Sequence, residues 1–119
     1  MTPRATLGEI TPFIPAGADL AAEIAFYRDA LGFAVLWQDG DFAGICRDGA
    51  GFVLVRNDVR EWADNASFNI AVSGLDELHE EYRTAPARVG PLEMKPWGRR
   101  EFHMIVPSGV CLRFHERQA

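Results

Sequence analysis

The sequence is short of cysteine, of histidine and of long hydrophobic runs. Its 119 residues include 2 cysteines and 3 histidines, too few for a multi-disulfide framework or a Cys/His zinc motif. Cys46 and Cys111 stand far apart in strand-like segments, so we expect two reduced thiols. No stretch reaches the roughly 18 apolar residues that a membrane span needs, and the opening residues do not resemble a signal peptide. We therefore expect a cytoplasmic protein that has no membrane partner.

Positive charge is also scarce. The chain carries 12 Lys and Arg against 17 Asp and Glu, which gives a formal net charge of -5. A nucleic-acid binder needs a basic face to neutralise phosphates, so we expect no nucleic-acid partner. The acidic balance suits a cationic ligand better, although solubility alone also explains it. Hydrophobic residues make up 48% of the chain, which is enough to build one packed domain at this length.

The first half of the chain predicts a strand, a helix and three further strands. Two prolines confine the first strand, residues 8–15, to a sheet edge or to an arm exchanged between two copies. Asp19 can cap the helix, which carries one apolar stripe over residues 20–31. Turn signals rich in Asp and Gly then separate three strands, at residues 33–38, 42–47 and 51–56.

The second half repeats this order. Residues 57–66 are polar and are expected to form a loop that links the halves. A strand over 67–73 and an amphipathic helix that begins near Leu75 follow this linker. The last three strands are expected at residues 92–96, 101–106 and 110–115. The chain is thus predicted to be one domain, residues 1–119, built from two βαβββ modules at about 8–56 and 67–116.

The pattern predicts an α+β fold. One helix covers only one face of the sheet in a βαβββ module, so the other face must meet something else. Two modules can pair into a curved mixed sheet with a cleft, and two chains can then pack about a two-fold axis. We therefore expect a homodimer whose ligand sites include the subunit boundary.

Four segments resemble the glyoxalase/bleomycin resistance protein/extradiol dioxygenase superfamily, also called the vicinal-oxygen-chelate superfamily. Residues 25–33 (AFYRDALGF) resemble a pattern seen throughout it. Three more segments are similar to its bleomycin-resistance branch: 41–48 (DFAGICRD), 74–82 (GLDELHEEY) and 96–102 (PWGRREF). The chain departs from the family at residues 106–110 (VPSGV), where members usually carry Asp-Pro-x-Gly-Asn. A paralogue with a shifted ligand fits this departure.

The resemblance implies an antibiotic-binding protein. It would confer resistance by sequestering bleomycin-type glycopeptides, which are small cationic molecules, in a groove at the dimer interface, with neither covalent chemistry nor a cofactor. Such drugs combine a planar bithiazole, a cationic tail and a polar head that binds metal. An alternative with the same fold is a glyoxalase-like lyase or a thiol transferase that acts on a small molecule. A third is a sensory or structural dimer that binds no drug.

Aromatic residues are the first candidates for a drug groove. Phe42 and Trp97 occupy positions that match the family motifs, so they are expected to line the groove and to stack on the planar part of the drug. Ordinary packing in the core or in an interface is the alternative for both. Trp37 and Phe68 are weaker candidates, and core packing is the favoured interpretation for them.

Polar candidates come from three places. Asp41 beside Phe42 and Asp64 in the linker could attract a cationic tail, or could simply be solvated. Asn65 resembles a linker residue of the resistance branch and would orient the ligand by hydrogen bonds. Glu101 and Arg113 are expected to form a polar wall of the cleft, or an ion pair with a purely structural role.

A metal centre and a catalytic residue are not expected. Enzymes of the superfamily place His and Glu on the first and last strands of each module, whereas Arg113 stands at the matching position of the last strand and would repel a metal. His79 lies among glutamates on a helix and should be solvated. His103 and His115 lie on adjacent strands and could face the cleft, as polar lining or, less favoured, as a two-His metal site. No residue pattern predicts an activated cysteine.

Overall fold

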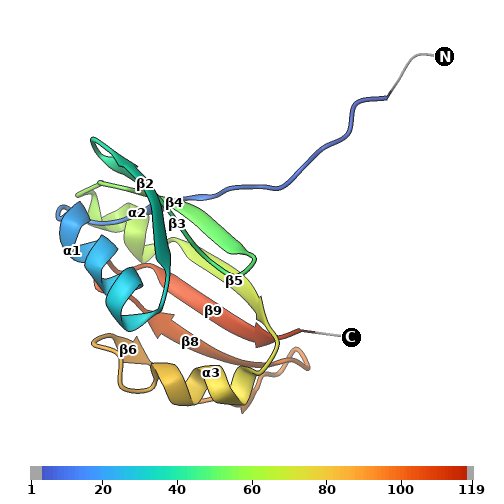
Figure 1. Cartoon of the computed structure of the whole chain (residues 1–119). Helices are drawn as coiled ribbons and strands as arrows, with labels where there is room; N and C mark the ends of the chain where they lie inside the picture. The colour runs from blue at the N-terminus through green and yellow to red at the C-terminus, as the bar shows by residue number, and fades with distance from the viewer. Residues whose placement is uncertain (1–3, 118–119) are drawn as a thin grey trace.

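The structure, a computed structural model that describes residues 4–117, is an α+β fold with two mixed sheets (Figure 1). The first half contains β1 (Phe13–Pro15), α1 (Leu20–Ala25), the π-helical turn η1 (Phe26–Ala30), β2 (Ala34–Asp39), β3 (Phe42–Arg47) and β4 (Ala50–Val55). After the linker helix α2 (Arg60–Asp64), the second half contains β5 (Ser67–Val72), α3 (Leu75–Tyr82), β6 (Arg88–Val89), β7 (Glu93–Met94), β8 (Arg100–Ile105) and β9 (Cys111–Glu116).

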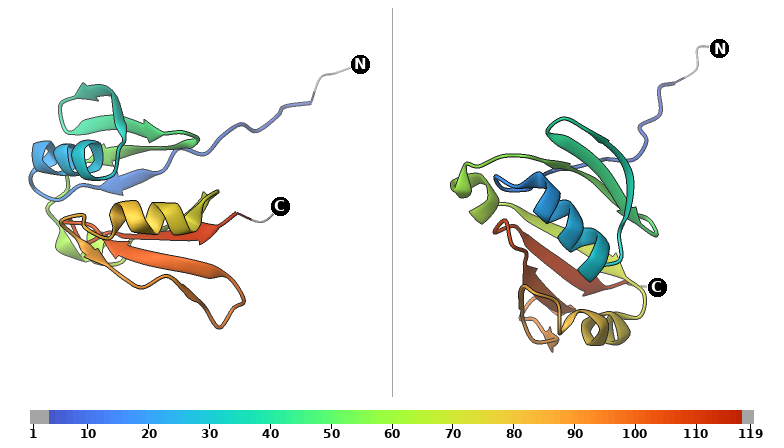
Figure 2. Two further views of the ribbon diagram at one scale, coloured as in Figure 1. Left: turned by 60° about the horizontal axis from the view of Figure 1, so that its bottom comes forward. Right: turned by 60° about the vertical axis from the view of Figure 1, so that its left-hand side comes forward.

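The two sheets share one strand arrangement. Their orders are β1-β4-β3-β2 and β5-β9-β8-β6, and β7 also pairs with β8. In each half the first strand runs parallel to the last strand, while the remaining pairs are antiparallel. The left view of Figure 2 shows the two halves one above the other, each with its own helix. The predicted α+β class and the mixed strand pairing are therefore confirmed, but the strands form two separate sheets rather than the single curved sheet that was predicted.

The helix predicted over residues 20–31 is confirmed, but its second half is π-helical. Asp19 Oδ1 accepts a hydrogen bond from the backbone N–H of Ala22 at 3.0 Å, as an N-cap should. Gly32 ends the helix with φ of 78°, a left-handed conformation that glycine adopts without strain. Leu20, Ile24 and Tyr27 are buried, which points the predicted stripe inward.

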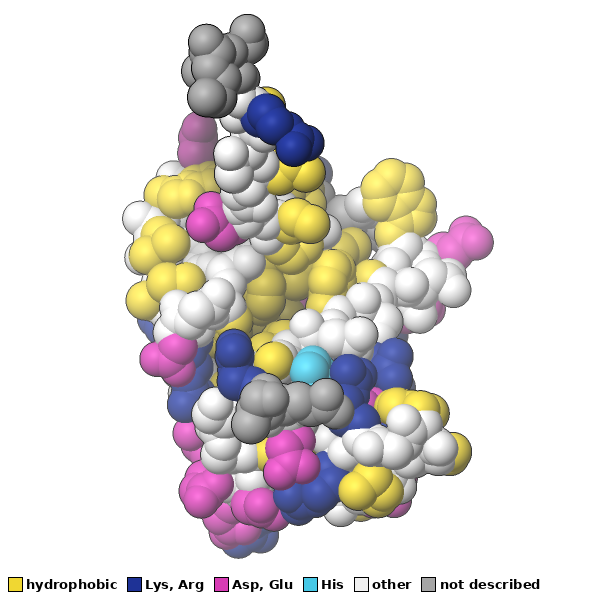
Figure 3. Space-filling model, turned by 90° about the vertical axis from the view of Figure 1, so that its right-hand side faces the viewer, with side chains coloured by type: hydrophobic (Ala, Val, Ile, Leu, Met, Phe, Trp, Pro, Cys, Tyr) yellow, Lys and Arg dark blue, Asp and Glu magenta, His cyan; other side chains and the backbone are white. Residues whose placement is uncertain are grey.

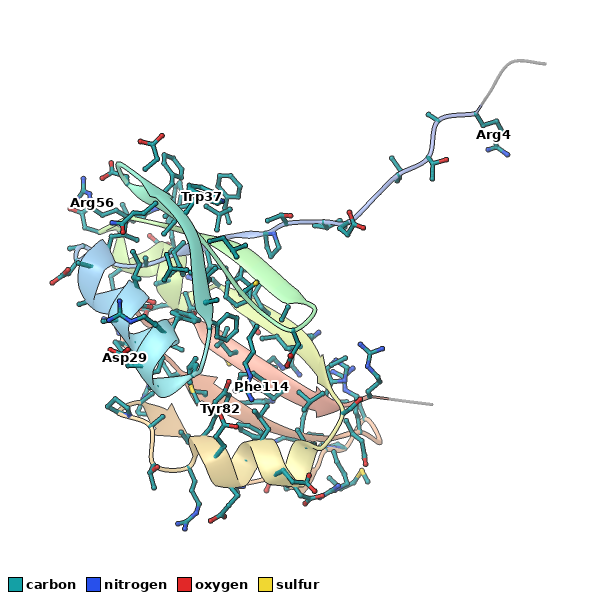
Figure 4. All side chains as sticks on the ribbon, in the orientation of Figure 1. Arg4, Asp29, Trp37, Arg56, Tyr82 and Phe114 are labelled. Carbon is teal, nitrogen blue, oxygen red and sulfur yellow. The ribbon has the colours of Figure 1, made fainter. Side chains whose placement is uncertain are left out.

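One hydrophobic core joins both halves. It combines the inner faces of the two sheets with the buried faces of α1, η1 and α3. Tyr82 and Phe114, labelled in Figure 4, pack edge to face in the second half with ring centroids 5.5 Å apart. Phe102 stacks on Phe114 with centroids 5.0 Å apart. None of the described helices has the length and apolar character that crossing a membrane would require.

The linker prediction was wrong in part, because residues 57–66 contain α2 rather than a loop throughout. Asn57 Oδ1 accepts a hydrogen bond from the backbone N–H of Val59 at 2.9 Å, just before the helix. Ala63 on the inner side of α2 is buried in the core. Tertiary packing of this kind stabilises short helices that local propensity would not predict.

Two further expectations differ from the structure. The first strand spans residues 13–15 rather than 8–15, and the preceding residues extend away from the sheet as an arm (Figure 1). His79 was expected to be solvated, but its ring packs on Phe102 with centroids 4.7 Å apart. His79 Nε2 lies 3.0 Å from the carbonyl oxygen of Gly90. The short strand β6 beside Gly90, not predicted from the sequence, brings that carbonyl within reach of α3.

Candidate functional site

Each sheet turns one face to the core and leaves the other face open. In the first sheet, strand alternation points Ile14, Ile45 and Leu54 inward, where they are buried. The opposite face carries Phe13 and Phe42, with 61% and 40% of their surface exposed. Their rings form an edge-to-face pair with centroids 6.1 Å apart. Large apolar side chains on an open sheet face mark a surface suited to binding another molecule.

Trp37 extends this aromatic surface across the sheet. A β-bulge at Leu36 shifts the register of β2, so that Trp37 lies opposite Gly44 on β3. The indole covers Gly44 closely, and a Cβ at that position would collide with Nε1 of Trp37. Trp37 was a weak candidate with core packing favoured, yet it is half-exposed and projects from β2 in Figure 4.

The acidic residues beside Phe42 differ in their pairing. Asp41 Oδ1 accepts a hydrogen bond from Nε of Arg56 at 3.0 Å, so its charge is balanced by a neighbour. Asp39 ends β2 opposite Phe42, and its side chain is exposed. The end of this hairpin therefore offers one exposed carboxylate and one carboxylate in an exposed ion pair.

The open face of the second sheet is polar and centres on a buried carboxylate. Glu101 is 0% exposed, and both of its oxygens are occupied. Oε2 accepts hydrogen bonds from Nε1 of Trp97 at 3.2 Å and from Nε of Arg99 at 3.0 Å. Oε1 accepts one from Nη2 of Arg113 at 3.1 Å and lies 2.7 Å from Nε2 of His103. Glu101 and Arg113 thus form the ion pair considered from the sequence.

These contacts keep the carboxylate ionised. Burial alone would raise the pKa of Glu101, but hydrogen bonds from His103, Trp97, Arg99 and Arg113 together outweigh it and lower the pKa to about 2. Because two guanidinium groups surround one carboxylate, the local charge of this cluster is positive. The second sheet face therefore differs from the acidic average of the chain.

Trp97 lies beside this cluster. Its Nε1 edge is hydrogen-bonded to Glu101, and Arg113 lies over one face of its ring. Trp97 belongs to the turn before β8, and 56% of its surface is exposed. The guanidinium carbon of Arg113 stands 5.4 Å from the centroid of its ring, in the geometry of a cation–π contact. Such a ring can still offer its uncovered surface to a planar ligand.

The remaining candidates lie elsewhere. Asp64 forms an i,i+4 ion pair with Arg60 at 2.8 Å, and Asn65 Nδ2 donates to the carbonyl oxygen of Glu61 at 2.8 Å at the end of α2. Phe68 points to the core side of β5 and packs against the hydrophobic core. The structure therefore brings Trp97 beside Glu101 and Arg113 of the second sheet. It places Asp41 and Phe42 together at the turn between β2 and β3, and Asp64 and Asn65 at the linker.

A cavity lies between the two halves rather than on either open face. Its volume is about 990 Å³, and its walls come from the β3–β4 hairpin, β5, α3 and the base of the N-terminal arm. Phe52, Phe68 and Ile70 line its apolar part, while Arg47 and Glu81 stand among its polar lining. Figure 3 looks onto this side of the molecule and shows hydrophobic side chains gathered in a hollow. Of the residues predicted to bind ligand, Phe68 lines this cavity.

The donor groups of the open faces do not fit a metal centre. Within residues 4–117, no three His, Cys, Asp or Glu side chains gather closely enough to hold a metal ion. His103 is engaged with Glu101, and His115 Nδ1 lies 3.2 Å from the carbonyl oxygen of Glu116. Both cysteines are free, and burial raises the pKa of the Cys111 thiol, which disfavours its nucleophilic thiolate form.

Two residues of the open faces were missed from the sequence. Phe13 lies opposite Val53 in the parallel pairing of β1 with β4, which brings it beside Phe42. Arg99 completes the hydrogen bonds to Glu101. The alternation of β1 carried a signal for Phe13, whereas the position of Arg99 depends on the turn before β8.

Comparisons with known proteins place this geometry among solved structures. No protein-family model matches the sequence, and no curated protein matches it. The bleomycin-binding protein from bleomycin-producing Streptomyces verticillus, solved with copper(II)-bleomycin, is 29% identical with a TM-score of 0.81, over 95% of this chain and 100% of that one. The bleomycin resistance determinant encoded on transposon Tn5 is 20% identical with a TM-score of 0.83, over 95% and 100%.

A third structure comes from the wider group. A member of the glyoxalase/bleomycin resistance protein/dioxygenase superfamily from Sphaerobacter thermophilus is 19% identical with a TM-score of 0.71, over 93% of this chain and 98% of that one. These similarities span nearly the full length of each chain. The resemblance predicted from the sequence motifs is therefore confirmed, and the chain has the fold of the glyoxalase/bleomycin resistance protein/dioxygenase superfamily.

Proposed function

We propose that this protein binds a bleomycin-type glycopeptide antibiotic and protects its host by sequestering the drug without covalent chemistry. The observation that carries the proposal is the exposure of Phe42 on the open face of the first sheet and of Trp97 beside the open face of the second. Both residues occupy motif positions shared with the bleomycin-resistance branch, and both present ring surface to solvent. Planar heterocycles such as a bithiazole stack on surfaces of this kind. The full-length similarity to a structure solved with copper(II)-bleomycin supports the same ligand class.

The second part of the proposal is a homodimer whose groove combines the two kinds of face. Phe13, Trp37 and Phe42 leave an apolar surface on the first sheet that a monomer would expose to water. A second copy that laid its polar sheet face opposite this surface would place Trp97 across a groove from Phe42. The drug would then lie between aromatic rings of two chains, and its cationic tail would point toward Asp39 and Asp41.

Titration calorimetry with metal-free bleomycin and with copper(II)-bleomycin tests the ligand. The wild-type chain should bind about one drug per chain, and Phe42→Ala and Trp97→Ala should each weaken binding by about tenfold or more, as expected for stacking residues. Trp62→Ala is the matched control, because Trp62 is equally large and exposed but lies on the linker helix α2. Light scattering should give a mass twice the 13.2 kDa of one chain.

A second variant distinguishes a drug site on the open faces from a drug site in the cavity between the halves. Ser73→Trp would obstruct that cavity, because Ser73 lines it and is exposed. On the present proposal this variant binds the drug as the wild type does. Loss of binding in Ser73→Trp, with normal binding in the Phe42 and Trp97 variants, would move the site into the cavity. No heat with either form of the drug would discard bleomycin as the ligand.

A further inference from the structure

The hydrogen bond between Trp97 and Glu101 joins an exposed donor to a buried acceptor. The indole is more than half-exposed, yet its N–H is tied to a carboxylate that is itself 0% exposed. A hydrogen bond that ends on a charged, buried acceptor is stronger than one made in water. Solvent competition cannot easily break it, because water does not reach the acceptor.

The carboxylate is held in place independently of the tryptophan. Arg99 and Arg113 donate to its two oxygens from two different segments, the turn before β8 and the strand β9, and His103 contacts it from β8 itself. Removal of the indole would leave these contacts intact. Glu101 is therefore held in place independently of the exposed ring that donates to it.

Two constraints on the ring follow from this arrangement. Glu101 holds the Nε1 edge at 3.2 Å, and the guanidinium of Arg113 lies 5.4 Å from the ring centroid. Because Glu101 also binds Arg113, one carboxylate fixes both the ring and the cation against it. A side chain fixed in this way loses less conformational entropy on binding than a freely rotating one.

We propose that Glu101 is a positioning residue that fixes the orientation of Trp97 and so prepares the free surface of its ring for a planar ligand. The part of this inference that concerns a planar ligand rests on the proposed function. The part that concerns the orientation of Trp97 depends on this chain alone. Glu101 contacts no ligand on this view, because its surface is covered and both of its oxygens are occupied by side chains of the protein.

The geometric part is tested without any drug. In a background of Trp37→Phe and Trp62→Phe, Trp97 is the sole tryptophan of the 3 in the chain. Glu101→Gln removes the charge while keeping the shape, and we expect about a twofold rise in acrylamide quenching of Trp97 together with a fall in its fluorescence anisotropy, because a charged acceptor holds the indole more strongly. Glu93→Gln is the matched control, since Glu93 pairs opposite Glu101 across β7 and β8 but is tied to Lys95. Equal quenching and anisotropy in wild type and Glu101→Gln would overturn the proposal.

The functional part uses a double-mutant cycle with bleomycin. Trp97→Phe keeps an aromatic ring but removes the N–H. It therefore removes the hydrogen bond to Glu101 at the donor, even if Glu101→Gln fails to fold. Each single variant should lose about tenfold in affinity, and the double variant should lose no more than the worse single variant. Fully additive losses would overturn the positioning role. A wild-type chain that binds no drug would remove the proposed function, while the fluorescence comparison would still decide whether Glu101 positions the ring.

Discussion

Arg47 on β3 and Glu81 on α3 form an ion pair between the two halves of the chain, with Nη1 of Arg47 2.7 Å from Oε2 of Glu81. The same Nη1 donates to the carbonyl oxygen of Leu31 and to the hydroxyl oxygen of Tyr82, each at 2.9 Å. Tyr82 in turn donates to the carbonyl oxygen of Leu31 at 2.7 Å. One guanidinium therefore joins β3, the end of the first helix and α3.

Replacement of Arg47 by methionine should destabilise the fold. The variant removes hydrogen bonds to Leu31, Glu81 and Tyr82 while it keeps the aliphatic stem, so we expect a loss of about 1–3 kcal/mol in the free energy of unfolding. Urea denaturation followed by far-UV circular dichroism measures this loss. Arg28→Met is the control, because Arg28 pairs with Asp29 on the exposed surface and should change the midpoint little. Equal midpoints for wild type and Arg47→Met would refute the role of Arg47 in joining the halves.

Stability should fall as the pH rises because of Glu23. Burial raises the pKa of Glu23, and the nearby Ser108 lowers it by less. The folded state then holds the proton more tightly than the unfolded state, whose carboxyl has an ordinary pKa near 4.5. The contribution of Glu23 to stability is therefore complete below that value and is lost as the pH rises through the folded pKa.

Glu23→Gln removes this dependence. Chemical denaturation at pH 4, 6 and 8 should show the variant gaining stability relative to the wild type as the pH rises. Glu9→Gln, in the exposed arm, provides the control and should follow the wild type throughout. If the difference between Glu23→Gln and wild type does not change with pH, then the pKa of Glu23 is the same in the folded and unfolded states and burial does not raise it.

Gly44→Ala should move Trp37 without unfolding the sheet. The new Cβ would meet the indole nitrogen of Trp37, and the half-exposed ring can move outward toward solvent at a cost of about 1 kcal/mol or less. We expect a red shift in the fluorescence of Trp37 in a chain that carries Trp62→Phe and Trp97→Phe, and weaker drug binding if Trp37 lines the groove. Gly49→Ala is the control, because a Cβ there meets nothing within 4 Å. An unchanged emission spectrum would contradict the close contact.

Local signals in the sequence predicted most of the fold. The first helix was predictable because both its cap, Asp19, and its stop, Gly32, act through neighbouring residues. The linker helix α2 was not predictable from local signals. It is stabilised by burial of Ala63 in the core, whose other residues come from distant parts of the sequence. The extent of the first strand depends likewise on a partner that is distant in sequence, because Phe13–Pro15 pair with β4.

The sequence could propose some residues of the candidate site but not their contacts. Motif positions selected Phe42 and Trp97 as candidates, and the side chains of both are exposed. The four contacts to Glu101 could not be read from the sequence, because they depend on the register of β8 against β9, which sets His103 opposite Arg113. A shift of one residue in that register would turn Glu101 toward the core.

The two halves repeat one topology, yet their open faces have separate chemistries, aromatic on the first sheet and ionic on the second. The same strand arrangement therefore carries two different surfaces. Mutations on one open face leave the side chains of the other face untouched, so selection can adjust the two faces independently.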